Sequence, residues 1–312
     1  MLRECARHYL GEPLLGWGSL RGGLFNTTYR LDIPGRAVIL RLGPVNRHLL
    51  LPYEQGLMAA EPAIQELLRA HGVPTSRTVV LDTSKTFLDR DIAIVEMIPG
   101  RNMATLELLP QDEKCLCRRA GELTRLIHRA TANELPVIPD RPFGRASQVL
   151  AGEGSGTWKE AMLLELSQWS ECARREDTFS GEEICRIECC FRRHSSVFDV
   201  VSVPALVHGD LWYGNILAGE DGAIAAIIDS DRAYFGDPEF DLMLPWMPSG
   251  PFLEGYGMDL DMSENAVLRR KVYRFLLQLE DAYILQVEYR DPDGYSSAKR
   301  TALASLEELE NT

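Results

Sequence analysis

Three polar residues at fixed spacing are the part of this 312-residue sequence best suited to chemistry. His208 and Asp210 stand on either side of Gly209, and Asn215 follows the aspartate by five positions. Apolar residues precede and follow the stretch, so we expect a loop between two short buried segments that holds both side-chain oxygens on one side. A carboxylate there could align and deprotonate an attacking hydroxyl, and an uncharged amide oxygen could bind a hard cation such as Mg²⁺.

A further acid follows an apolar segment a short distance along the chain. Residues 223–228 are all apolar, and Asp229 comes directly after them. The two stretches together match the kinase pattern H-x-D-L-x-x-x-N followed by D-F-G, in which the last aspartate is the other magnesium ligand. Ser230 and Asp231 replace the Phe-Gly pair, which departs from the protein-kinase pattern.

A third motif extends the match. The chain resembles the aminoglycoside phosphotransferase and choline-kinase-like enzymes, which phosphorylate hydroxyl groups of small molecules on a protein-kinase-like fold. Members carry H-G-D-x-x-x-x-N, then a strand ending in I-D, then G-D-P-x-x-D-L, and these motifs occupy residues 208–215, 228–229 and 236–242 here. The resemblance implies an α+β fold of two lobes: an N-terminal nucleotide-binding lobe (1–98) with a small antiparallel sheet and one helix, and a larger, mainly helical catalytic and acceptor-binding lobe (99–312).

The resemblance also implies a role for each motif residue. Asp210 would be the catalytic base, and Asn215 and Asp229 would hold Mg²⁺ against the phosphates of ATP or GTP. His208 and Asp241 would support the catalytic loop without reacting.

A glycine-containing turn leads into a strand near the N-terminus. Glycine permits close approach of backbone N–H groups to phosphates. In the family, G-G-x-x-N at this position is the phosphate loop, which implies that Gly22, Gly23, Asn26 and Thr27 contact the nucleotide. The sequence contains no G-x-x-x-x-G-K-[ST], which argues against a P-loop fold.

Residues 28–33 and 36–42 alternate around Pro34-Gly35 and predict an antiparallel hairpin. Kinases place a phosphate-binding lysine on the second strand, and the resemblance puts Arg41 in that position. Arginine is always charged and binds phosphate through two N–H groups, although its reach differs from that of lysine. Apolar spacing predicts a helix over 54–71, from which kinases draw a glutamate that orients this cation. The family spacing favours Glu61, with Glu54 as the alternative.

Two further strands, 77–82 and 91–97, complete the predicted sheet. The second runs into Pro99-Gly100, which resembles the family's hinge between the lobes. The carbonyl of Glu96 and the N–H of Ile98 would then bind the adenine edge.

The remainder of the chain predicts helices over 111–132, 158–172, 182–198, 265–289 and 296–309. Apolar walls with a few acids would suit a cationic sugar, so we select as acceptor-binding candidates Asp231, Tyr234, Trp246, Glu280 and Asp281. Cys185, Cys189, Cys190 and His194 fall in one predicted helix, and we expect buried thiols there rather than a structural metal.

These features favour a magnesium-dependent kinase that transfers the γ-phosphate of ATP or GTP to a hydroxyl of an aminoglycoside-like or other amino-sugar acceptor. A fructosamine or ketosamine kinase is the alternative, because H-G-D-L-W-x-G-N resembles the loop of those enzymes. Choline-type and homoserine-type kinases stay open. A nucleotide-binding pseudokinase is the alternative from another class, favoured by Arg41 and the altered D-F-G.

Composition and charge indicate which partners and which cellular compartment to expect. The net charge of −13 disfavours nucleic acid as a partner, because phosphate backbones require basic patches. The N-terminal residues form no secretion signal, and no apolar run is long enough for a membrane, so we expect a cytoplasmic protein without a membrane partner. The seven cysteines show no disulfide spacing, which agrees with a reducing compartment. The oligomeric state stays open.

Overall fold

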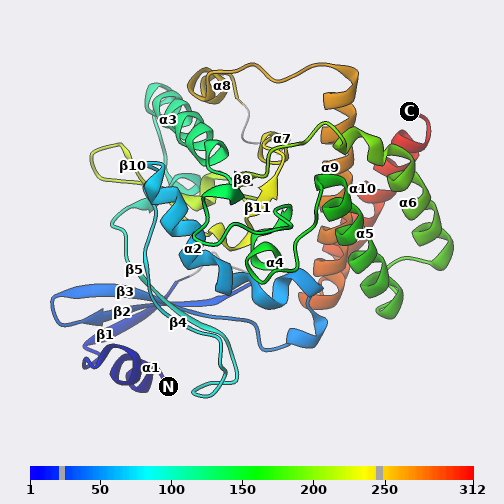
Figure 1. The fold of residues 1–312 in the computed structure, drawn as a ribbon. Coiled ribbons are helices and arrows are strands. Elements are labelled where there is room, and N and C mark those ends of the chain that lie inside the picture. Colours follow the sequence, from blue (N-terminus) through cyan, green and yellow to red (C-terminus); the bar gives the residue numbers. More distant parts are fainter. Residues whose placement is uncertain (21–24, 244–248) are drawn as a thin grey trace.

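A computed structural model of the chain describes residues 1–20, 25–243 and 249–312. It has the two-lobed layout expected of the kinase-like fold, with a five-stranded sheet in one lobe and a mainly helical second lobe (Figure 1). In Figure 1 the sheet lies at the lower left in blue and cyan, and the long helices lie to its upper side and right. The predicted fold class is therefore confirmed.

The larger sheet is antiparallel throughout, with the strand order β1-β2-β3-β5-β4. The strands are β1 (Gly16–Leu20), β2 (Thr27–Ile33), β3 (Arg36–Leu42), β4 (Thr78–Asp82) and β5 (Ile92–Glu96). Because side chains alternate along a strand, Leu40 and Leu42 face one side and Arg41 faces the other. The leucine side packs against Cys5 of α1 (Leu2–Cys5) and against the π-helical turn Ala6–Leu10. The other side is left for the cleft between the lobes.

The helix between β3 and β4 starts later than predicted. Residues Pro52–Gly56 form a 3-10 turn, and α2 extends over Leu57–Ala70. The side chain of Glu54 accepts the backbone N–H of Leu51 at 3.1 Å, so it caps the turn instead of starting an α-helix. Ile64 and Leu68 of α2 share one core with the helix α3 (Pro110–Arg129). By its packing, α2 therefore belongs with the C-terminal lobe as much as with the sheet.

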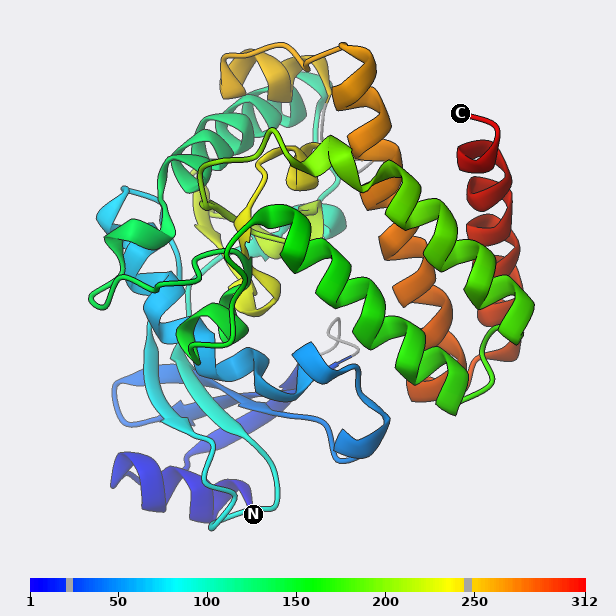
Figure 2. The same ribbon diagram turned by 45° about the vertical axis from the view of Figure 1, so that its right-hand side comes forward.

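The C-terminal lobe is built on the helices that the sequence predicts (Figure 2). The long ones are α3 (Pro110–Arg129), α5 (Trp158–Arg175), α6 (Gly181–His194), α9 (Glu264–Tyr283) and α10 (Pro292–Glu310). Shorter ones are α4 (Ala146–Leu150), α7 (Glu239–Leu242) and α8 (Gly250–Tyr256). The predicted helix 265–289 is α-helical only to Tyr283 and continues as the π-helical turn Ile284–Glu288.

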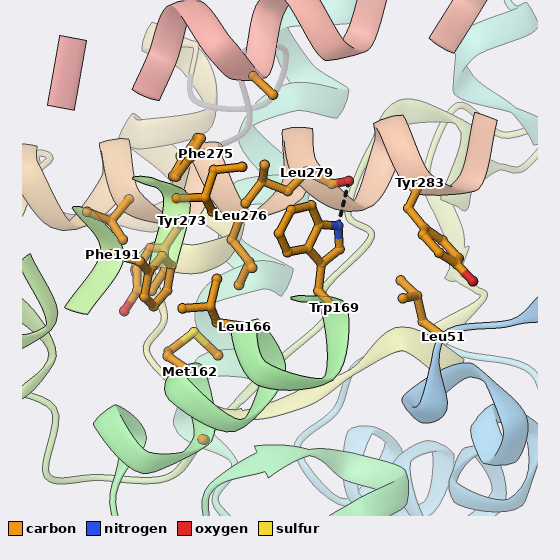
Figure 3. Packing of buried hydrophobic residues seen from close by; sticks show 14 of the residues in the cluster. Leu51, Met162, Leu166, Trp169, Phe191, Tyr273, Phe275, Leu276, Leu279 and Tyr283 are labelled. Atoms are coloured by element: carbon orange, nitrogen blue, oxygen red, sulfur yellow. Dashed lines mark hydrogen bonds between the residues drawn. The ribbon is translucent and has the colours of Figure 1, made fainter. Parts of the chain in front are cut away.

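Large aromatic side chains fill the core between α5, α6, α9 and α10 (Figure 3). Trp169 is buried, and its indole N–H donates to the carbonyl of Leu279 at 2.9 Å. The indole N–H of Trp158 likewise donates to the hydroxyl of Tyr273 at 2.6 Å. Buried indoles need such partners, because an unpaired N–H in a core costs stability. These bonds fix α5 against α9, and α9 carries residues that line the cleft.

Two small three-stranded sheets hold the segments that carry the motifs. Their orders are β10-β9-β6 and β7-β11-β8. They are formed by β6 (Arg101–Asn102), β7 (Gly144–Arg145), β8 (Ala205–Val207), β9 (Ile216–Ala218), β10 (Ile224–Ile227) and β11 (Tyr234–Gly236). The predicted catalytic loop thus connects β8 to β9, as the apolar segments on its two sides required.

The prediction for the cysteine-rich helix is wrong in part. Cys190 is buried, but Cys185 and Cys189 are exposed, because α6 turns Ile184, Ile187 and Phe191 toward the core instead. Within the described residues there is no group of three or more His, Cys, Asp or Glu placed to hold a metal. Nor do the described segments include a helix with the length and apolar character needed to cross a bilayer.

Candidate active site

A buried carboxylate supports the loop between β8 and β9. Asp241, in the short helix α7, accepts the backbone N–H groups of His208 at 2.8 Å and Gly209 at 2.9 Å. His128 lies 3.1 Å from the same carboxylate and 2.8 Å from the hydroxyl of Tyr256. Burial raises the pKa of Asp241, but the hydrogen bonds of His128 and of the His208 backbone outweigh it and lower that pKa. Asp241 therefore stays charged and holds the loop, in the place where the resemblance puts a supporting acid.

His208 connects this loop to the strand that leads to Asp229. Its ring is buried and donates through Nε2 to the carbonyl of Ile228 at 3.0 Å. Its Nδ1 accepts the backbone N–H of Asp210 at 3.3 Å. A single imidazole thus fixes the spacing between the two acidic segments.

Two glycines in the motif are required by close contacts. Gly209 has φ +78°, and a Cβ there would lie 2.2 Å from the carbonyl oxygen of Arg232. At Gly214 a Cβ would lie 2.0 Å from the indole ring of Trp212. The Trp212 ring therefore packs over Gly214 and occupies the space that a side chain at that position would need. This contact explains the W-x-G spacing of the loop.

Asp210 lies at the cleft with its carboxylate oriented by Asn215. The Asn215 amide nitrogen donates to the carbonyl of Asp210 at 2.8 Å and to its carboxylate at 3.0 Å. Burial raises the pKa of Asp210 to about 6. A base with a pKa slightly below neutral pH is deprotonated and still basic enough to accept a proton from a hydroxyl.

Arg41 forms a cluster with three carboxylates, which we call the Arg41 cluster: Arg41, Glu61, Asp229 and Asp231. Nη1 of the arginine is 2.5 Å from Glu61 of α2, and Nη2 is 2.6 Å from Asp229 and 2.8 Å from Asp231. Asp231 also accepts the Asn26 amide at 3.5 Å. One guanidinium thereby joins the sheet, α2 and the segment after β10.

The donor set around Asp229 fits a magnesium ion. With its amide nitrogen directed to Asp210, Asn215 leaves its amide oxygen without a hydrogen bond from the described residues. The Asp229 side chain is 37% exposed, and only its Oδ1 is engaged by Arg41. Its φ of +64° places it in the left-handed region, a strain that functional sites tolerate. Two hard oxygen ligands are enough where phosphates and water complete the shell of Mg²⁺.

These residues surround one cavity of about 480 Å³. We assign part of its lining to a phosphate side, because it carries the polar groups expected to contact nucleotide phosphates: Asn26, Thr28, Arg41, Asn215, Asp229 and Asp231. We assign a second part to an acceptor side, because it combines apolar residues with acids and arginines: Arg145, Trp212, Arg232, Leu277, Glu280, Asp281, Ile284, Leu285 and Tyr289. Phe25, Gly209 and Asp210 complete the lining.

The acceptor-binding candidates end up in different environments. Asp281 is exposed at the rim of the cavity, whereas Asp231 is buried in the Arg41 cluster on the phosphate side. Glu280 lines the cavity but is 3% exposed. Tyr234 is fully buried, and its hydroxyl donates to Glu165, so it is no acceptor contact in this structure. Trp246 lies outside the described residues.

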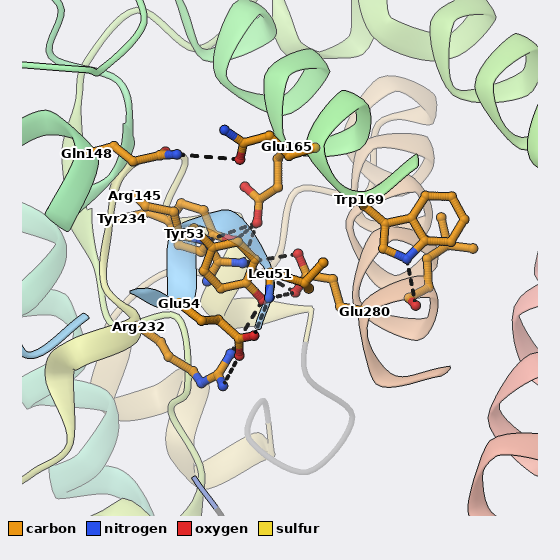
Figure 4. A network of polar contacts seen from close by, with 12 residues as sticks. Leu51, Tyr53, Glu54, Arg145, Gln148, Glu165, Trp169, Arg232, Tyr234 and Glu280 are labelled. Carbon is orange, nitrogen blue, oxygen red and sulfur yellow. Dashed lines mark hydrogen bonds and ion pairs between the residues drawn. The ribbon is translucent and has the colours of Figure 1, made fainter. Parts of the chain in front are cut away.

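Arg145 is the centre of a second cluster beneath the acceptor side (Figure 4). Its guanidinium lies 3.7 Å from the ring centre of Tyr53 and 4.0 Å from that of Tyr234. It pairs with Glu165 and, at 3.1 Å, with Glu280. We call this set of five residues the Arg145 cluster. Burial raises the pKa of Glu280, while the charge of Arg145 opposes that rise.

The remaining predicted nucleotide contacts lie outside the lining of this cavity or outside the described residues. Glu96 ends β5, where its backbone N–H donates to the carbonyl of Arg77 at 2.8 Å, and Ile98 follows in the connection between the lobes. Thr27 pairs with Leu42 at the start of β2. Gly22 and Gly23 lie outside the described residues.

Comparison with known proteins identifies the class. Residues 17–270 match the pattern of the phosphotransferase enzyme family, and the chain belongs to that family. It superimposes on the aminoglycoside phosphotransferase APH(4)-Ia with a TM-score of 0.72 and 16% identity, over 99% of this chain and 100% of the other. A structure from Thermobifida fusca described as a fructosamine-3-kinase gives 0.65 and 20%, over 97% and 98%. At these identities the likeness establishes the fold.

Two sequence relatives match part of the chain. A protein of Staphylococcus aureus named as a ketoamine kinase is 33% identical over 101 residues, which are 31% of this chain and 34% of the relative. One of Klebsiella pneumoniae with the same kind of name is 36% identical over 84 residues, 26% of this chain and 66% of the relative. Both matches span less than two thirds of the relative's length.

Two arginines of the site do not stand out in the sequence. Arg145 follows a glycine at the end of a short strand, and no motif marks it. Arg232 comes three positions after Asp229, and this proximity to a metal-binding candidate is its one signal in the sequence. Both residues act through partners far away in the sequence, so their positions follow from the fold alone.

Proposed function

We propose that this protein is a magnesium-dependent kinase that transfers the γ-phosphoryl group of ATP to a hydroxyl of an amine-bearing sugar derivative. The observation that supports this most is the convergence of Asp210, Asn215 and Asp229 on one cavity that Arg41 also lines. Positioning and charge stabilisation account for most of the catalysis in phosphoryl transfer, and this set provides both.

In the proposed reaction, Asp210 accepts the proton of the acceptor hydroxyl while the hydroxyl oxygen bonds to the γ-phosphorus. The bond from that phosphorus to the bridging oxygen breaks, and ADP leaves with the electron pair. Asn215 orients the base through its amide nitrogen. Arg41, held by Glu61, faces the phosphates from the sheet side.

Magnesium would be held by Asn215 and Asp229, where it would neutralise phosphate charge. The Arg41 cluster carries three acidic side chains and one guanidinium. The phosphates of a bound nucleotide would therefore meet excess negative charge at this side of the cavity. This charge balance supports the requirement for a divalent cation.

A ketosamine is our leading acceptor, which reverses the order that the sequence favoured. The change rests on the sequence relatives named as ketoamine kinases and on the packing of Trp212 over Gly214, which accounts for the H-G-D-L-W-x-G-N loop. The exposed acid Asp281 on the acceptor side suits an amine. Aminoglycosides share this charge but are supported by the fold alone.

The test is nucleotide consumption with MgATP or MgGTP against ketosamines, aminoglycosides, choline and simple sugars. We expect turnover with ketosamines that Asp210→Asn reduces by about 10²- to 10⁴-fold, the contribution of a general base. Turnover with aminoglycosides alone would overturn the ketosamine assignment and keep the kinase.

The pseudokinase alternative has a separate discriminator. Binding of MgADP, measured by calorimetry, should survive Asp210→Asn, because this residue is assigned to the acceptor proton. If the wild-type protein binds MgATP tightly but phosphorylates no acceptor in the panel, the binding-module interpretation replaces the kinase.

A further inference from the structure

Arg232 is a cation in the cleft without an assigned role. It ends the short 3-10 turn Ser230–Arg232 that follows Asp229, and it lines the cavity. Its side chain is 20% exposed. Hydrogen bonds from Nη2 to Glu54, at 2.7 Å, and from Nη1 to the Tyr53 hydroxyl, at 3.5 Å, use two of the five N–H donors of a guanidinium. The group is held and still has donors to offer.

The partner that holds Arg232 is itself fixed. The Glu54 side chain is fully buried, and its second oxygen accepts the backbone N–H of Leu51. Glu288, from the π-helical turn after α9, approaches the same carboxylate: burial and then the charge of Glu54 raise the pKa of Glu288 to about 10. The raised pKa favours the neutral form of Glu288 beside Glu54. Figure 4 shows Arg232 directed at Glu54 below the Arg145 cluster.

Two observations place Arg232 beside the reacting groups. The carbonyl oxygen of Arg232 abuts Gly209, next to the base, where a Cβ would come within 2.2 Å. The guanidinium carbon lies 5.4 Å from the ring centre of Phe25, which lines the same cavity.

The chain therefore presents two arginines to one cavity from different elements. Arg41 comes from β3 and is held by Glu61, while Arg232 comes from the segment after β10 and is held by Glu54, seven residues earlier than Glu61. Both glutamates precede or belong to α2, which packs into the C-terminal core. One continuous segment, the 3-10 turn followed by α2, thus holds both cations, and the backbone ties Arg232 to Asp229.

We propose that Arg232 is a second catalytic cation of the kinase, in addition to Arg41, and that it contacts the γ-phosphoryl group during its transfer. This inference rests on the proposed function. As the bond from the bridging oxygen to phosphorus lengthens and the hydroxyl oxygen approaches, negative charge develops on the equatorial oxygens. A guanidinium held in place beforehand stabilises that charge without reorganising, and it contributes little to binding of the ground-state nucleotide.

The decisive measurement compares wild type, Arg232→Lys and Arg232→Ala in kcat, in the KM for each substrate, and in affinity for MgADP with and without aluminium fluoride, an analogue of the transferring phosphoryl group. We expect Arg232→Ala to lower kcat by about 10²- to 10³-fold, the effect of removing one preorganised donor. Affinity for MgADP alone should be unchanged, whereas the gain from aluminium fluoride should be lost. Free guanidinium should restore part of kcat in Arg232→Ala.

Controls separate this role from a structural one. Arg232→Ala leaves Glu54 buried without its partner, so Glu54→Gln/Arg232→Ala, which removes the unpaired charge, is measured beside it. Arg118→Ala removes an arginine from an exposed pair with Glu254 and should leave all readouts at wild-type values.

An unchanged kcat with a raised acceptor KM would overturn the proposal and make Arg232 an acceptor contact. So would a loss of kcat that leaves the aluminium fluoride gain intact. Absence of turnover in the wild type would defeat the proposed function instead, and the aluminium fluoride comparison would still decide the contact with the phosphoryl group.

Discussion

The Arg41 cluster and the Arg145 cluster use the same ion chemistry for different ends. Each places one buried guanidinium among acids that come from distant parts of the chain. In the Arg145 cluster the arginine is enclosed between two tyrosine rings, and both of its acids are buried. In the Arg41 cluster Asp229 is 37% exposed to the cavity and has a left-handed backbone conformation.

This difference in exposure indicates which of the two clusters can exchange a protein contact for a contact with a ligand. A charge that is fully paired and stacked on aromatic faces has nothing to gain from a ligand, so the Arg145 cluster acts as a fixed floor beneath the acceptor side. Asp229 keeps one carboxylate oxygen available. The Nη2 group of Arg41 could exchange its hydrogen bond to Asp229 for a hydrogen bond to a phosphate. The Arg41 cluster, which is open to the cavity, is therefore assigned to ligand binding. The Arg145 cluster, which is closed, is assigned to positioning.

Breaking the closed cluster should have the largest effect. Arg145→Met removes the cation and leaves Glu165 and Glu280 buried without their partner, which we expect to lower the free energy of unfolding by about 3–5 kcal/mol. Urea denaturation followed by circular dichroism measures the change. The matched control is Arg118→Met in the exposed pair with Glu254, for which about 0–1 kcal/mol is expected.

A triple variant refines this result. Arg145→Met combined with Glu165→Gln and Glu280→Gln removes the uncompensated charges together, so it should recover part of the stability lost in the single variant. If Arg145→Met is as stable as wild type, the Arg145 cluster is not the fixed floor described above.

The open cluster should show the opposite pattern, with a large loss of activity and little loss of stability. Asp229→Asn removes one of three acids around Arg41 and one magnesium ligand. We expect kcat/KM to fall by about 10²- to 10³-fold, because metal-based charge stabilisation is worth several kcal/mol. The free energy of unfolding should change by no more than about 0.5 kcal/mol, as for an accessible side chain.

The magnesium dependence of nucleotide binding provides the second readout for this variant. Calorimetric titration with ATP at several Mg²⁺ concentrations should show a strong dependence in wild type and a weak one in Asp229→Asn. An unaltered dependence would remove Asp229 from the metal site.

The two clusters also differ in how far sequence could predict them. Residues of the open cluster lie in or near motifs, so the resemblance to the family selects the β8–β9 loop, Asp229, Arg41 and Glu61, with Glu54 as the alternative to Glu61. The confirmed helices and strands follow from apolar periodicity in the same way. Arg145, Glu165 and Tyr53 carry no local signal, because their roles come from contacts between β7, α5 and the turn before α2.

One further error has a local physical cause. The helix predicted from residue 54 begins at Leu57, because the Glu54 side chain caps the preceding turn. Asp231, a predicted acceptor contact, lines the cavity and lies 2.8 Å from Arg41. Neither the capped turn nor this ion pair can be derived from the spacing of residue types.

The titration of Asp210 tests whether the open side carries the proposed base. Its pKa, raised by burial to about 6 from an ordinary value near 4, means that the active, deprotonated form is lost as the pH falls through 6. Initial rates at saturating MgATP should therefore be level above pH 7 and fall by about tenfold for each pH unit below 6. A rate that is unchanged down to pH 5 would contradict a catalytic role for this carboxylate.

The smallest effect is expected at the rim, where an acid lies in neither cluster. Asp281 lines the cavity but is exposed, so its attraction for an amine is screened by water and salt. For Asp281→Asn we expect the KM of a cationic acceptor to rise by a few-fold, corresponding to about 0.2–1 kcal/mol, with kcat and stability unchanged. A neutral acceptor with the same hydroxyl is the control, because its KM should not respond. Equal rises in KM for both acceptors would show that Asp281 shapes the cavity without sensing charge, and the acidic rim would then cease to support an amine-bearing substrate.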